Sequence, residues 1–138
     1  MKVINEEALT GERSLFKSKD LDIINSNFFD GESPLKESRD INIKSCVFGW
    51  KYPLWYCDDI NVYDTTFLET ARSGIWYTNN ITIKNTIIDA PKTFRRGSNI
   101  RLINVNIPNG LETLWNCKDI VMENITAKGD YFGMNSED

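Results

Sequence analysis

The feature that most constrains this chain is a unit of about 20 residues that recurs six times along it. Each copy starts with an apolar residue, passes through polar, aromatic and small residues, and then reaches Leu or Ile. The leading apolar residues are Leu15, Leu35, Leu54, Ile75, Phe94 and Leu114. Because a fixed period marks repeat architectures, the sequence predicts a stack of equivalent structural units.

When the six copies are aligned, equivalent residues form columns, and two of these columns are apolar. Together they predict a short strand in each copy. The first is Leu21, Ile41, Ile60, Ile81, Ile100 and Ile120, and the second, two residues later, is Ile23, Ile43, Val62, Ile83, Leu102 and Met122. Apolar residues at i and i+2, rich in Ile and Val, are typical of a strand with one buried face. No window has the 3, 4, 7 spacing of an amphipathic helix. The sequence therefore predicts an all-β fold, a single-stranded parallel β-helix (a solenoid) of about six coils.

Several segments resemble a known family. The stretch GERSLF (Gly11 to Phe16) and the units PLWYCDDINV and GIWYTNNITIKN are similar to the DUF3737 family of bacterial proteins. The resemblance extends from about Gly11 to Met134 and implies a right-handed β-helix of the pectin-lyase-like class. Members of that family are typically about twice as long, so this chain resembles their N-terminal half. The family has no established activity or catalytic residues, and the resemblance therefore assigns no site.

The chain is expected to form a single domain over residues 1–138, because single domains commonly contain about 100–200 residues. Residues 1–14 are expected to supply an N-terminal cap or strand, residues 15–129 the six coils, and residues 130–138 the start of a seventh coil or a tail. An uncapped terminal coil exposes unpaired backbone groups. We therefore expect a homodimer through the C-terminal coil, with a tail folded over that end as the alternative.

Charge and hydropathy exclude several classes of protein. The chain has 16 basic and 20 acidic side chains, a net charge of −4, whereas nucleic-acid-binding proteins normally carry a basic stripe. No segment approaches about 18 consecutive apolar residues, so no membrane span is expected. The segment after Met1 has no apolar signal core, and the chain is expected to be cytoplasmic.

The cysteines and the absence of histidine argue against a metal site or a cofactor. The sequence contains Cys46, Cys57, Cys117 and no histidine, and it has no Cys-x-x-Cys spacing. Cys57 and Cys117 occupy equivalent positions three coils apart, roughly 14 Å, which is too far for a disulfide. We expect buried, reduced thiols.

A column of Asp and Asn offers one catalytic hypothesis. Its members are Asp20, Asp40, Asp59, Asn80, Asn99 and Asp119. Asp20, Asp40 and Asp59 are the candidate carboxylates of a polysaccharide hydrolase. However, inverting hydrolysis needs carboxyl groups about 6.5–9.5 Å apart, while adjacent coils are about 4.8 Å apart. A position that takes Asn or Asp equally is typical of a turn, which is the interpretation we favour. A lyase would instead use a base among Arg95, Arg96 and Arg101, but no acidic ligand group accompanies them in the repeat.

A second column combines aromatic and cationic side chains. It follows each leading residue and contains Phe16, Lys36, Trp55, Trp76, Arg95 and Trp115, with Tyr56 and Tyr77 directly after the first two tryptophans. Because the leading residue points inward, alternation sends these side chains outward. The face is a self-contained ladder, a protein interface or a glycan-binding surface.

The sequence thus favours a non-catalytic binding or assembly module over an enzyme. Its expected working surface is the face of Trp55, Trp76, Arg95 and Trp115, with Tyr56, Tyr77 and Lys36 beside it, and its ligand would be a protein or a glycan. The alternative is a carbohydrate-active enzyme of the pectin-lyase-like class, a hydrolase or lyase.

Overall fold

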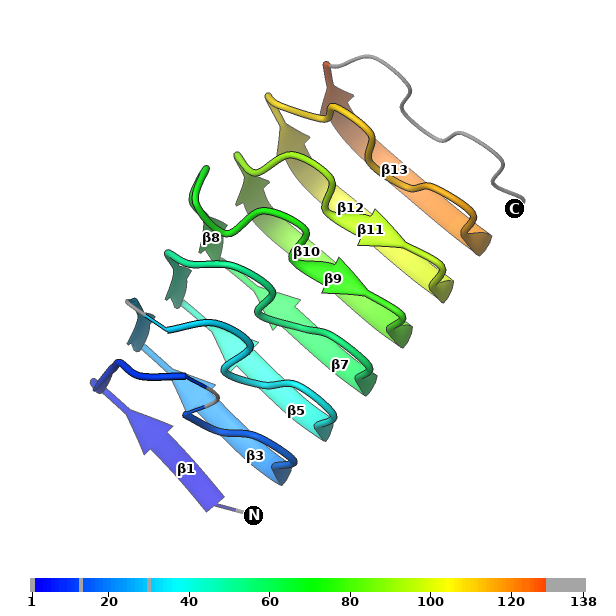
Figure 1. The fold of residues 1–138 in the computed structure, drawn as a ribbon. Coiled ribbons are helices and arrows are strands. Elements are labelled where there is room, and N and C mark those ends of the chain that lie inside the picture. Colours follow the sequence, from blue (N-terminus) through cyan, green and yellow to red (C-terminus); the bar gives the residue numbers. More distant parts are fainter. Residues whose placement is uncertain (1, 13, 30, 129–138) are drawn as a thin grey trace.

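The computed structural model describes residues 2–12, 14–29 and 31–128. Its strands are β1 (Lys2–Asn5), β2 (Ala8–Leu9), β3 (Lys19–Ile24), β4 (Asn27–Phe28), β5 (Arg39–Lys44), β6 (Val47–Phe48), β7 (Asp58–Tyr63), β8 (Thr66–Phe67), β9 (Ile75–Trp76), β10 (Asn79–Ile88), β11 (Phe94–Arg95), β12 (Ser98–Ile107) and β13 (Lys118–Ala127). In these ranges the chain has no helix able to cross a membrane. The strands wind into a right-handed parallel solenoid of about six coils (Figure 1), which confirms the predicted fold.

One long parallel sheet extends along the whole solenoid. Its strands follow the order β1, β3, β5, β7, β10, β12 and β13. The short strands β2, β4, β6 and β8 form a second row that joins the end of β10. On the opposite side of the coils, β9 pairs with β11 (Figure 1). Each coil therefore has a long strand on one side and a short returning segment on the other.

The strand register follows the repeat. Leu21 pairs with Ile41, Ile41 with Ile60, and Ile60 with Ile81. Residues one repeat apart are thus neighbours in adjacent strands, about 4.8 Å apart in the hydrogen-bonding direction. Every column of the sequence becomes a ladder along the axis, and this is what brings the candidate site residues together.

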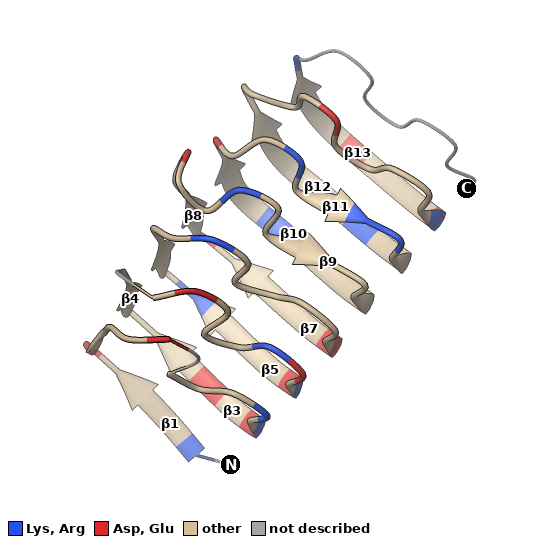
Figure 2. Cartoon of the chain, in the orientation of Figure 1, with Lys and Arg blue, Asp and Glu red and all other residues tan. Residues whose placement is uncertain are grey.

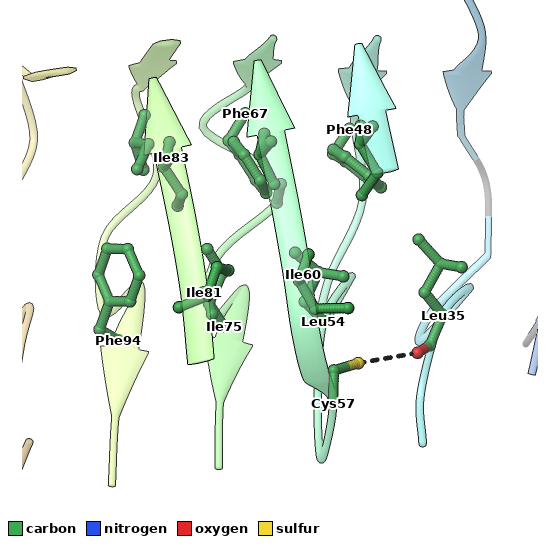
Figure 3. Packing of buried hydrophobic residues seen from close by; sticks show 14 of the residues in the cluster. Leu35, Phe48, Leu54, Cys57, Ile60, Phe67, Ile75, Ile81, Ile83 and Phe94 are labelled. Carbon is green, nitrogen blue, oxygen red and sulfur yellow. Dashed lines mark hydrogen bonds between the residues drawn. The ribbon is translucent and has the colours of Figure 1, made fainter. Parts of the chain in front are cut away.

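The apolar columns fill the interior of the solenoid. Leu35, Leu54 and Phe94, which lead their repeats, are all fully buried, and Figure 3 shows the leading residues facing the apolar residues of the long strands. A further ladder is aromatic. The rings of Phe28 and Phe48 stack with centroids 4.7 Å apart, and those of Phe48 and Phe67 with centroids 4.9 Å apart.

Left-handed backbone recurs at the corners of the coils. All six members of the Asp and Asn column have φ between 53° and 57°, a conformation that Asp and Asn tolerate better than most residues. A second left-handed column contains Glu37, Tyr56 and Tyr77, with φ of 57–60°. These residue types have no special preference for that conformation, so the sequence gives no sign of this corner. The pairing of adjacent coils imposes it.

The first strands at the N-terminal end lie within the described residues, whereas the last segment at the C-terminal end does not. At the N-terminal end β1 pairs with β3 and β2 pairs with β4, so residues 2–9 extend both rows of strands. At the other end β13 pairs with β12. The segment 130–138, expected to be the start of a seventh coil or a tail, lies outside the described residues.

Candidate binding face

The aromatic and cationic column lies on the side of the solenoid opposite the long sheet. Trp76 ends β9, Arg95 ends β11, and these two residues are partners in the pairing of the strands. Trp55 precedes Trp76 by one coil, and Trp115 forms a parallel bridge with Arg95. The side chains of this column are half-buried. We call the surface formed by Lys36, Trp55, Tyr56, Trp76, Tyr77, Arg95 and Trp115 the ladder face.

The rings of the ladder face stack on one another. Trp55 and Trp76 are parallel, with centroids 5.1 Å apart and an interplanar angle of 4°. Tyr56 and Tyr77 stack in the same way, with centroids 4.7 Å apart and an angle of 6°. Tyr77 also contacts Trp55 and Trp76 edge to face, at 6.4 Å and 6.3 Å. The spacing of the coils sets these distances, and each such aromatic contact stabilises the fold by about 0.5–1.5 kcal/mol.

Hydrogen bonds fix the two indoles in place. Trp55 Nε1 donates to the carbonyl oxygen of Ser73 at 2.5 Å, and Trp76 Nε1 donates to that of Lys92 at 2.7 Å. Both acceptors belong to corner residues with left-handed backbone in the next coil. The indoles of Trp55 and Trp76 are therefore each held by stacking and by a hydrogen bond within the chain.

The outer faces of the stacked indoles are also covered. The guanidinium carbon of Arg95 lies 5.0 Å from the centroid of Trp76, and Tyr52 packs on Trp55 with centroids 4.4 Å apart. Arg95 Nε is buried and has no hydrogen-bond partner among the described residues, while the guanidinium group lies over the indole ring at a distance suited to a cation–π interaction. At the other end of the face, Lys36 Nζ lies 5.9 Å from the centroid of Tyr56.

The ladder face therefore presents ring edges rather than ring faces. Trp55 and Trp76 each have a neighbour on both sides of the ring, while Tyr56 is 49% exposed. The sequence had not placed Tyr52 on this face, because it stands before the leading residue in a corner whose length varies between repeats. The indole hydrogen bonds were also missed, since their carbonyl acceptors carry no sequence signal.

The Asp and Asn column lies at a corner of the long sheet. Asp20, Asp40 and Asp59 are exposed, and Figure 2 shows acidic residues where β3, β5 and β7 begin. Asn80 Nδ2 donates to Asp59 Oδ1 at 3.2 Å, and Asn99 Nδ2 donates to the amide oxygen of Asn80 at 2.7 Å. Four members of the column, Asp20, Asp40, Asp59 and Asn80, line a hollow of about 540 Å³ together with Asn42 and Asn61.

The three arginines considered for a lyase are not gathered in one place. Arg95 stacks on Trp76, and Arg96 is an exposed corner residue with φ of 51°. Arg101 is exposed on β12, in the long sheet on the other side of the coil from β11 (Figure 1). Within residues 2–12, 14–29 and 31–128, no group of three or more Cys, Asp or Glu side chains could hold a metal ion.

The three cysteines are buried, and this burial makes their thiols unreactive. All three are free thiols inside the solenoid. Burial raises the pKa of the Cys57 thiol to about 12 and also raises the pKa of Cys46 and Cys117. Cys57 Sγ lies 3.0 Å from the carbonyl oxygen of Leu35, to which it donates a hydrogen bond (Figure 3). A neutral thiol is a poor nucleophile.

The fold and the face define a parallel β-solenoid protein with an ordered aromatic surface. The chain belongs to the DUF3737 family, described as proteins of unknown function, which matches residues 2–138. This confirms the family resemblance. No curated protein matches the chain. Among solved structures it is similar to trypsin-treated QnrB1, a plasmid-mediated fluoroquinolone resistance protein, with a TM-score of 0.39 and 14% identity over 96% of this chain and 71% of that one.

Proposed function

We propose that the chain is a non-catalytic binding module that holds a protein partner on the ladder face. The observation that carries this proposal is the closed stack of Trp55 and Trp76, whose rings are parallel and 5.1 Å apart. A surface that is ordered before binding loses little conformational entropy when a partner docks. Trp, Tyr and Arg are also the residues most enriched at the energetic centres of protein interfaces.

The charges of the ladder face favour an acidic partner. Lys36 lies at one end of the ladder face, and Arg95 lies between Trp76 and Trp115, with the exposed Arg96 directly after it. Ring edges carry partial positive charge, because an aromatic ring is negative on its face and positive on its edge. Edges and cations together attract carboxylates, so we propose a partner segment that presents acidic and aromatic side chains.

A glycan is the less favoured ligand for this face. Sugars that bind aromatic side chains lay their apolar side on an open ring face. Trp55 is covered by Tyr52 and Trp76, and Trp76 is covered by Trp55 and Arg95. Binding a sugar there would require breaking a stack and releasing an indole hydrogen bond.

A pair of tryptophan variants tests the proposal. Trp76→Leu removes the centre of the ladder face, whereas Trp50→Leu removes an indole that is 38% exposed outside this face. Binding of a random glutamate–tyrosine copolymer is measured by isothermal titration calorimetry for both variants and the original chain. We expect Trp76→Leu to weaken binding at least tenfold, about 1.4 kcal/mol, and Trp50→Leu to leave it unchanged. Equal effects of the two variants would contradict the proposal.

The alternative function is a carbohydrate-active enzyme of the pectin-lyase-like class. The observation that favours it is the hollow lined by Asp20, Asp40 and Asp59. The left-handed backbone at these residues provides a conformational reason for the same column. Asp40→Asn keeps the corner and removes the carboxylate. Loss of polysaccharide cleavage in this variant, measured by product analysis, would support the enzyme.

We also propose that the protein works in a reducing compartment, the cytoplasm of a bacterium. The support for this location is the state of the cysteines, all three of which are buried and free. Buried thiols without disulfides are typical of proteins from reducing environments. Localisation of a tagged chain by cell fractionation tests the proposal, and recovery in the secreted fraction would contradict it.

A further inference from the structure

The last described coil leaves the apolar columns of the solenoid uncovered. In β12, Ile100, Leu102 and Ile107 are at most 1% exposed. Their partners in β13 are Ile120, Met122 and Ala127. Met122 is 49% exposed, Ala127 is exposed and Ile120 is half-buried. Among the described residues no strand pairs with the outer edge of β13. A long, apolar, unpaired edge is a template for another strand.

The N-terminal coil does not offer a matching edge. Lys2 stands opposite Leu21, in a column that is apolar in every later coil. Glu7 lies beside Ser26, whose hydroxyl oxygen accepts a hydrogen bond from the Glu7 amide. The N-terminal edge is divided into β1 with 4 residues and β2 with 2, whereas β13 continues through both rows with 10. Charged residues at core positions protect an edge against further pairing. Stacking of one copy's C-terminal coil on another's N-terminal coil is therefore disfavoured, and a filament would not grow.

A second copy of β13 fits this edge if the two strands run antiparallel. We propose that the chain forms a closed dimer in which β13 pairs with β13 of a second copy, about a two-fold axis between Glu123 and Asn124. The inward residues of β13 are Ile120, Met122, Ile125 and Ala127, and they lie symmetrically about that point. Ile120 of one copy then faces Ala127 of the other, and Met122 faces Ile125. This proposal is independent of the ladder face.

The direction of the backbone groups agrees with this register. In an inner coil, the carbonyl of Cys46 accepts from Thr66 N of the next coil at 3.1 Å, and that of Phe48 accepts from Leu68 N at 2.9 Å. Ile125 and Ala127 occupy the columns of Cys46 and Phe48. Their carbonyl groups therefore point toward the open edge, where antiparallel pairing needs acceptors.

The outward residues are also complementary in this register. Asp119 of one copy faces Lys128 of the other, which gives two symmetric pairs of opposite charge. Glu123 faces Asn124, so a carboxylate can accept from a side-chain amide, and the β-branched Val121 faces Thr126. Shifting the register by two residues would place Met122 opposite Glu123, an inward residue against an outward one. Cross-strand pairs of this kind specify register.

A cysteine cross-link with a matched control tests the dimer directly. In the proposed register, two Glu123→Cys side chains lie on the same face with α-carbons about 6 Å apart, within disulfide range. Lys84→Cys is the control, because Lys84 lies in the same column two strands further from the edge. Its two copies would be about 24 Å apart. Under mild oxidation we expect a linked dimer from Glu123→Cys and none from Lys84→Cys.

Charge exchange tests the register. Asp119→Lys and Lys128→Asp should each weaken self-association by about tenfold, because each replaces two attractive pairs with repulsive ones. The double variant should restore it to within about threefold. Asn99→Lys introduces a lysine at the equivalent corner of β12, one strand away from the edge, and should leave self-association unchanged.

Mass by light scattering completes the test, with twice 15.9 kDa expected for the original chain. A monomer at high concentration would overturn the proposal. A dimer in which Glu123→Cys does not cross-link, or in which the double variant does not recover, would place the interface elsewhere and also overturn it.

Discussion

Asp40 lies at a corner where the backbone is left-handed, with φ of 56°. Its equivalents in the other coils, whether Asp or Asn, have the same conformation. Left-handed backbone costs most L-residues roughly 1–2 kcal/mol, and short polar side chains reduce this cost by hydrogen bonding locally. The column is therefore explained at the scale of the single residue, without catalysis.

This explanation predicts how Asp40 responds to substitution. Asp40→Ala should lower the free energy of unfolding by about 1 kcal/mol, because alanine lacks the polar side chain that suits the corner. Asp40→Asn should change it by less than about 0.5 kcal/mol. Urea denaturation measures both. Destabilisation by Asn as large as that by Ala would show that the negative charge, and not the corner, is what matters at this position.

Cys57 gives a prediction about pH. Its pKa is raised to about 12 in the fold, from 9.0 for an ordinary thiol, chiefly by burial. The thiol therefore stays protonated in the folded chain, while in the unfolded chain it ionises above about pH 9. Its contribution to stability is complete below pH 9 and is lost as the pH rises from 9 toward 12.

A variant isolates the effect of this one thiol. Cys57→Thr uses the residue found in the same column at Thr78. Between pH 9 and 10 the original chain should lose up to about 1.4 kcal/mol more stability than the variant, as one pH unit corresponds to about 1.36 kcal/mol. Urea unfolding at several pH values measures the difference. Parallel curves for the two proteins would contradict burial of a neutral Cys57.

At the scale of the element, ladders of like residues hold adjacent coils together. The central ring of the phenylalanine stack is Phe48 on β6, which contacts Phe28 and Phe67. Phe48→Ala should cost about 3–5 kcal/mol, since it removes buried area and leaves a cavity. Val47→Ala, on the outer side of β6, should cost less than about 1 kcal/mol. Similar losses in chemical denaturation would mean that the stack is not a core element.

The repeat shows which elements can be predicted from sequence and which cannot. The register of the long strands follows from the period, because residues such as Leu21 and Ile41 must share a column. The corner at Tyr56 does not follow, since tyrosine has no preference for left-handed backbone. The stack of Trp55 and Trp76 was expected as one of three interpretations. The covering of both indoles was not expected, because Tyr52 lies outside the repeated columns.

At the scale of the whole molecule, the acidic, aromatic and apolar surfaces lie on different sides and ends of the solenoid. The long sheet and its acidic corner lie on one side, and the ladder face lies on the other. The N-terminal coil carries charged residues at Lys2 and Glu7, whereas β13 keeps the apolar pattern of the inner coils. In the proposed dimer, a solenoid of this kind presents one lateral face while its C-terminal coil pairs with another copy.

We propose, above all, that the ladder face binds an acidic protein segment and that the chain cleaves no polysaccharide. The most direct measurement is a titration of tryptophan fluorescence against the glutamate–tyrosine copolymer and, in parallel, against acidic and neutral oligosaccharides, with product analysis of every sample. We predict a saturable change with the copolymer, no saturable change with the oligosaccharides and no cleavage products. Saturation by an oligosaccharide together with its cleavage would contradict the account and assign the function to the acidic corner.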